Sequence, residues 1–197
     1  MKSFTILVIG LVFAVQATAQ KRITCQYIAV KKAQYDSVVR TPFLVFNQQV
    51  RKQSGRLLIP LANQQYKIFS DINVDSDMGE YSYLGDVRGT KLALVKKTEL
   101  HNARYYLVNQ LNGKVDTLIG VPVFAANMQD FACLNNPDTD EDQQIQVGLL
   151  KENGVITKGY ISTRAKTFFH GIAYGGKHAL FAMDDNGKYW KLDALTE

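Results

Sequence analysis

Two acidic stretches of the chain carry the residue types that bind calcium. In residues 71–77 and again in 138–142, an acidic or amide side chain stands at every second position, as in the first half of an EF-hand loop. Such a loop also needs glycine at its sixth position, where this chain has Ser76 and Gln143, and glutamate at its twelfth, which it lacks. We therefore interpret both stretches as solvated loops and predict no metal or other cofactor.

Motifs for catalysis are absent from the sequence. His101, His170 and His178 are too far apart for a local metal pair, and two cysteines cannot complete a cysteine-rich zinc site. The chain has no Gly-x-Ser-x-Gly nucleophile motif, no Walker motif and no dinucleotide-binding motif. The sequence therefore favours a protein that is not an enzyme.

Four tyrosines form the main aromatic concentration. Tyr81, Tyr83, Tyr105 and Tyr106 lie in two segments of strand-like composition, and exposed aromatic faces stack on sugars or anchor a partner protein. We predict that these four residues bind a ligand or partner. Packing within a β-sheet is the alternative, because tyrosine is a common strand residue.

The first nineteen residues resemble a secretory signal peptide. Lys2 precedes an apolar run over residues 4–15, and the small residues Ala17 and Ala19 follow it. The run is too short for a membrane-spanning helix, so we expect cleavage after Ala19, a mature domain of residues 20–197, and a periplasmic, secreted or cell-surface location. No second long apolar run follows, so we expect no transmembrane segment in the mature chain.

The two cysteines, Cys25 and Cys133, both lie in the expected mature chain. An exported protein meets an oxidising compartment, so we predict a disulfide between them. Two buried free thiols are the open alternative, because sequence does not show whether the side chains meet.

Charge is unevenly distributed along the chain, whose formal net charge is +5. From residue 20 to residue 67 there are nine Lys or Arg residues against Asp36 alone, whereas the acidic stretches come later. Outside the cytoplasm a basic surface meets anionic glycans or acidic proteins rather than nucleic acid. We therefore expect an envelope protein or an anionic glycan as partner, and no nucleic acid.

Turn signals divide the chain into short runs rich in β-branched and aromatic residues. Asn-Gly pairs at 112–113, 153–154 and 186–187 each separate two such runs, which predicts three β-hairpins. The pattern returns about every 40–50 residues, as propeller blades do. We predict one all-β domain of antiparallel meanders, propeller-like with a few blades, with a β-sandwich or an open barrel as alternatives.

Residues 122–131 resemble, in a degraded form, the blade entrance of TolB-type propeller repeats, and the segment from Gly175 to Trp190 resembles it more closely. The likeness implies an envelope protein that binds other proteins, and it transfers no catalytic residue. Residues 81–135 also resemble small secreted proteins of Gram-negative bacteria whose function is unknown.

These observations favour a non-catalytic binding or assembly module of the cell envelope. One alternative is a small secreted enzyme acting on envelope polysaccharide or peptide, whose carboxylates come together only in the fold. Another is a small-ligand carrier whose strands surround an apolar cavity.

Overall fold

The computed structural model describes residues 21–38, 42–74, 77–137, 142–163, 167–175 and 179–194. Within these ranges the regular secondary structure is almost entirely antiparallel strand, which confirms the predicted all-β class. The expected signal peptide, residues 1–19, lies outside the described residues.

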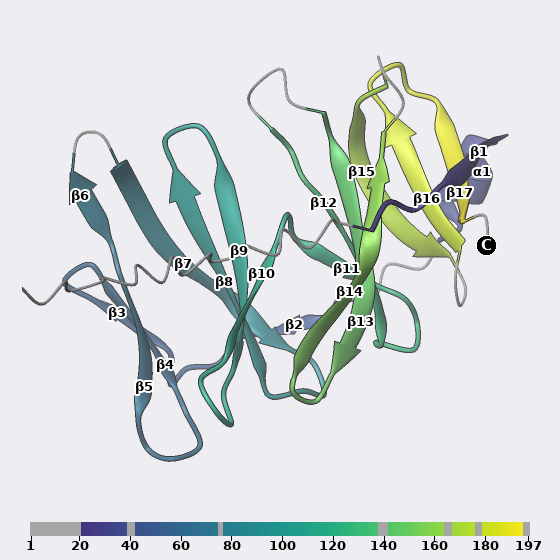
Figure 1. Cartoon of the computed structure of the whole chain (residues 1–197). Helices are drawn as coiled ribbons and strands as arrows, with labels where there is room; N and C mark the ends of the chain where they lie inside the picture. The colour runs from purple at the N-terminus through teal and green to yellow at the C-terminus, as the bar shows by residue number, and fades with distance from the viewer. Residues whose placement is uncertain are drawn as a thin grey trace, which may run out of the picture.

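The strands form four sheets, which we number I to IV (Figure 1). Sheet I has the strand order β3 (Arg51–Gln53), β4 (Arg56–Pro60), β5 (Tyr66–Ser70). Sheet II has the order β10 (Val115–Leu118), β9 (Ala103–Asn109), β8 (Leu92–Glu99), β7 (Asp77–Val87), β2 (Leu44–Val45), with β6 (Ile72–Val74) also paired to β7.

Sheet III has the order β11 (Pro122–Phe124), β12 (Asp130–Leu134), β13 (Gln144–Lys151), β14 (Gly154–Ser162). Sheet IV joins both ends of the described chain, in the order β1 (Cys25–Val30), β17 (Tyr189–Ala194), β16 (Ala179–Asp184), β15 (Phe169–Gly175). One short helix, α1 (Lys32–Asp36), follows β1 and contacts β17.

The three predicted hairpins are present. They are β9–β10, β13–β14 and β16–β17, and each contains one of the Asn-Gly pairs. Gly113 and Gly187 have φ angles of +74° and +71°, a conformation that glycine adopts without steric cost. Local turn chemistry therefore fixes these strand pairs.

The sheets pack one against the next. β4 and β5 contact β7, β9 and β10 contact β14, and β11 and β12 contact β15. In Figure 1 the four sheets accordingly follow one another from left to right. The successive antiparallel meanders form an open row and the described strands form no closed barrel, which is consistent with a sandwich or an open propeller-like arrangement.

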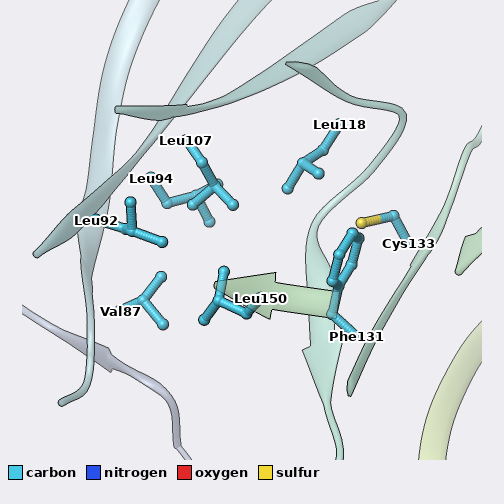
Figure 2. Packing of buried hydrophobic residues seen from close by; sticks show 8 residues of the cluster. All are labelled: Val87, Leu92, Leu94, Leu107, Leu118, Phe131, Cys133 and Leu150. Atoms are coloured by element: carbon cyan, nitrogen blue, oxygen red, sulfur yellow. The ribbon is translucent and has the colours of Figure 1, made fainter. Parts of the chain in front are cut away.

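A hydrophobic cluster fills each space between successive sheets. Leu57 and Ile59 of sheet I meet Val95 of sheet II in one cluster, and Ile145 of sheet III meets Leu180 of sheet IV in another. Figure 2 shows the cluster between sheets II and III, formed by Val87, Leu92, Leu94, Leu107, Leu118, Phe131, Cys133 and Leu150. Burial on the inner faces of each pair of sheets therefore holds the row together.

The predicted disulfide is not formed in this structure, where Cys25 and Cys133 are both free thiols. Successive side chains of a strand point to opposite faces. On β12, Ala132 packs toward sheet IV, so Cys133 points the other way, into the cluster with sheet II. Cys25 lies on β1 in sheet IV and packs against the cluster on the far side of sheet III.

Candidate functional site: a groove lined with amides

The four predicted tyrosines are divided between two faces of sheet II. Tyr81, Tyr83 and Tyr106 lie on the face toward sheet I, and Tyr105 packs into the cluster with sheet III. The Tyr81 ring lies 5.1 Å from that of Phe69 and 6.3 Å from that of Tyr106. These rings contribute to packing between sheets, and the structure does not gather all four into one surface.

Tyr83 differs from the others because it belongs to a polar network. Its hydroxyl donates to Oδ1 of Asp86 at 2.8 Å and accepts from the backbone N–H of Asn47 at 3.2 Å. Oδ2 of Asp86 accepts from the Asn47 side chain at 3.0 Å, and Oδ1 accepts from Gln110 at 3.4 Å. Burial and the Asp86 carboxylate raise the pKa of Tyr83, so its hydroxyl stays protonated as a donor.

A bulge in β7 brings Tyr83 and Asp86 to the same side of the strand. The register with β8 shifts between Tyr83 and Gly85, and an extra residue at a bulge resets the alternation of side chains. Gly85 has a φ of +144°, and a Cβ atom there would lie 2.9 Å from Cβ of Leu44. Glycine at this position therefore permits β2 to approach, and with it the segment that carries Asn47.

Beside this network two adjoining cavities, of about 370 and 240 Å³, form a groove at one end of sheets I and II. Gln49, Pro60 and Leu61 line both cavities. We call it the amide groove because its polar lining includes Asn47, Gln49, Gln64, Gln65 and Gln110, together with the cations Arg51 and Lys91.

Two copies of one tripeptide build much of this lining. Asn-Gln-Gln occurs at 47–49 and again at 63–65. In each copy the asparagine Oδ1 accepts from the backbone N–H two residues later, at 3.0 Å for Gln49 and 3.1 Å for Gln65. Asparagine thus closes the turn, and three of the four glutamines, Gln49, Gln64 and Gln65, line the groove. The repeated tripeptide is a signal in the sequence for this groove, whereas the prediction from sequence was based on the tyrosines.

The rim of the groove exposes apolar surface. Tyr66 and Leu111, which line it, are 50% and 52% exposed. Phe46, next to Asn47, is 72% exposed, and its ring lies 5.7 Å from that of Tyr83. An aromatic ring beside amides and cations offers a stacking face together with donors and acceptors.

The groove does not have the paired carboxylates of a glycoside hydrolase. Among its described lining residues Asp86 is the one carboxylate, and its oxygens already accept from three side chains. A general acid needs a raised pKa.

Elsewhere in the described chain, three carboxylates have a lowered pKa. The hydrogen bond from Lys97 lowers the pKa of Glu99. Burial alone would raise the pKa of Asp71 and Asp184, but the hydrogen bonds that these carboxylates accept outweigh it and lower their pKa.

Among the residues that the structure describes, no three His, Cys, Asp or Glu side chains gather in one place. Asp71 binds the Lys52 ammonium at 2.9 Å and accepts from the Tyr81 N–H. Residues 75–76 and 138–141 lie outside the described ranges, as does His178, whereas His101 and His170 are exposed.

A separate cavity of about 480 Å³ lies between sheets III and IV, beside α1. Its lining is mainly apolar and includes Phe124, Met128, Tyr174 and Phe181. The Tyr174 hydroxyl donates to the Phe131 carbonyl at 3.4 Å, and burial raises its pKa.

No protein-family model matches the chain, and no curated protein is similar enough in sequence to count as a match. Across the ranges given above, no helix is both long and apolar enough to cross a bilayer.

Proposed function

We propose that the protein is an exported, non-catalytic binding module whose amide groove holds an anionic glycan of the cell envelope. The observation that carries this proposal is the convergence of the two Asn-Gln-Gln turns with Arg51 and Lys91 around one groove. Side-chain amides donate and accept at once, as sugar hydroxyls require. The two cations suit carboxylate or sulfate groups.

The surroundings of the groove support an anionic ligand. Arg51 and Lys91 line it, and Asp86, the one described carboxylate there, is occupied by three hydrogen bonds. The signal-peptide pattern of residues 1–19 supports export. An exported protein meets the glycans of the envelope rather than nucleic acid.

Titration of the chain from residue 20 with a polyuronate hexasaccharide, followed by calorimetry, tests the proposal. We expect saturable binding that weakens at higher salt, because exposed charges are screened. Gln49→Ala, which truncates a side chain shared by both cavities, and Lys91→Gln should each weaken binding at least tenfold.

Lys188→Gln is the matched control, because it removes the same charge from an exposed turn of sheet IV. It should leave the affinity unchanged. Equal weakening by Lys91→Gln and Lys188→Gln would show nonspecific charge attraction, and binding of a neutral hexasaccharide with the same affinity would contradict the role of the cations.

The apolar cavity between sheets III and IV favours a second candidate function, a carrier of a small apolar ligand. Its volume of about 480 Å³ lies within the range of small-molecule sites. Saturable fluorescence enhancement of the apolar probe 1-aminoanthracene, abolished by Ala126→Phe at the exposed side of the lining, would support it. Probe fluorescence that does not change on adding protein would exclude it.

A further inference from the structure

Sheet I is the smallest of the four sheets and stands at one end of the row (Figure 1). It has three strands, whereas the other sheets formed by the described residues have four or six. One of its edges is β5, which pairs only with β4 among the described strands. An unpaired strand edge is a template for another strand.

The backbone groups of alternate residues in β5 point away from the sheet. At one end of the β4–β5 pair Asp71 donates its N–H to the Gly55 carbonyl at 2.7 Å, and at the other Leu61 donates to Gln65 at 2.9 Å. Hydrogen-bonded pairs recur at every second position of an antiparallel ladder, so residues 67 and 69 bond to β4. The N–H and C=O groups of residues 66, 68 and 70 therefore face outward.

The side chains of these same residues form an exposed strip, which is apolar at Tyr66 and Ile68. Tyr66, Ile68 and Ser70 are exposed, with Tyr66 at 50% and Ile68 at 42%. Leu58 lies beside Ile68 in register, and Pro60 lies beside Tyr66. Proteins usually protect an edge strand with a charge, a proline or a bulge. β5 has none of these at its outward positions.

The edge is complementary to itself. If an antiparallel copy is centred on Ile68, then Ile68 faces Ile68 of the second copy and Tyr66 faces Ser70 of the second copy. All outward backbone groups then meet outward backbone groups, as a hydrogen-bonded ladder requires. Across the junction Leu58 and Ile68 continue into their equivalents, which makes one apolar row.

Charge permits the same register. Lys67 is the one charged residue of β5, and in this register it faces Phe69 of the second copy rather than another lysine. Like charges directly opposite would destabilise a strand pair, and none arises here. The neighbouring Lys52 is already paired with Asp71 and Glu80, at 2.9 and 2.8 Å.

We propose that two copies of this chain pair through β5, antiparallel about Ile68, so that two copies of sheet I become one continuous sheet. The occupant of this edge is a second copy rather than an acidic partner strand, because the register, the apolar row and the position of Lys67 are all self-complementary.

Sedimentation velocity of the chain from residue 20, over a range of concentrations, tests the dimer. We expect a monomer–dimer equilibrium that Ile68→Lys weakens at least tenfold, because two lysines would then face each other on the symmetry axis. Ile156→Lys is the matched control, since Ile156 is 53% exposed on a strand of sheet III. It should leave the equilibrium unchanged.

Hydrogen exchange distinguishes loss of the dimer from loss of the fold. In the native protein the amides of residues 66, 68 and 70 should become protected from exchange as the protein concentration rises. The Ile68→Lys variant should lose that protection and keep the protection of the β8 amides.

The proposal is overturned if the native chain stays monomeric at about 100 μM, a concentration at which even a weak micromolar dimer forms, and binding of an acidic peptide would not rescue it. A dimer that Ile68→Lys leaves intact would also overturn it. Gln49→Ala and Lys91→Gln should not affect the dimer, so failure of glycan binding and failure of dimerisation are separate results.

Discussion

At the scale of single residues, the two cysteines give a direct chemical test of the structure. Burial, with a smaller contribution from Asp193, raises the pKa of Cys25 from 9.0 to about 11, and burial raises the pKa of Cys133 as well. The thiolate is the reactive form, so at pH 8 native Cys25 should react with iodoacetamide roughly a hundredfold more slowly than an unperturbed thiol. Its rate should rise as the pH approaches 11.

Cys133 should react only after unfolding, because it is fully buried. Because the fold holds both thiols neutral, their contribution to stability is fully present below pH 9 and declines as the pH rises above 9; the contribution of Cys25 is lost by about pH 11. Mass spectrometry of the unreduced, unfolded protein after alkylation gives the check. Two alkyl groups agree with the structure, whereas a product without alkyl groups, two mass units lighter than the reduced chain, would show a Cys25–Cys133 bridge.

Residue types alone did not indicate which polar groups lie together. Tyr83 lies next to the amide groove because it is bonded to Asp86, yet Tyr105 faces a different sheet. The side on which a strand residue projects depends on bulges and on long-range register, here the bulge before Gly85. The amides were missed because glutamine has no distinctive chemistry until several of them surround one cavity.

At the scale of elements, Gly148 in β13 provides a test of packing between strands. A Cβ atom there would lie 2.5 Å from the Ile156 carbonyl oxygen and 2.6 Å from the fully buried Phe131 ring. Gly148→Ala should therefore lower the free energy of unfolding by about 1–3 kcal/mol, as overpacking in a core does. Urea denaturation followed by the fluorescence of Trp190 measures it.

Gly171→Ala in β15 is the matched control. The nearest atom to its added methyl group would be the Tyr35 hydroxyl oxygen at 3.6 Å, an ordinary contact. We expect a change within about 0.5 kcal/mol. Equal destabilisation by the two substitutions would point to strand propensity rather than to the Phe131 contact.

Elements with a local signal were predicted, and elements without one were not. The three Asn-Gly hairpins are present because their turn residues and alternating strands are adjacent in the chain. The five-residue helix α1 has no amphipathic period long enough to detect. The β3–β4 turn of sheet I lacks that signal, because it uses Ser54 and Gly55, at φ +48° and +70°, rather than an Asn-Gly pair.

At the scale of the whole molecule, the N-terminal segment joins the two last sheets of the row. Ile23 donates its N–H to the Tyr160 carbonyl at 2.8 Å, and Tyr160 donates to the Lys21 carbonyl at 2.9 Å, which attaches the segment to β14 of sheet III. Directly afterwards β1 pairs with β17 of sheet IV. Pairing between the first and last described strands has no local signal in the sequence, since it closes nearly the whole chain.

Gly159 makes this attachment possible, because a Cβ atom there would lie 2.5 Å from the Lys21 carbonyl oxygen. Deleting residues 21–24 should remove two backbone hydrogen bonds, worth about 1 kcal/mol each, and the packing of Ile23 against the cluster between sheets III and IV, worth roughly 1–2 kcal/mol. We therefore expect the free energy of unfolding to fall by about 3–4 kcal/mol, and the Tyr160 amide to lose its protection from hydrogen exchange. Replacing Lys21 and Arg22 by glutamine retains the backbone bonds and should change stability by less than about 0.5 kcal/mol. If the Tyr160 amide stayed protected after the deletion, residues 21–24 would not be the segment that links sheets III and IV.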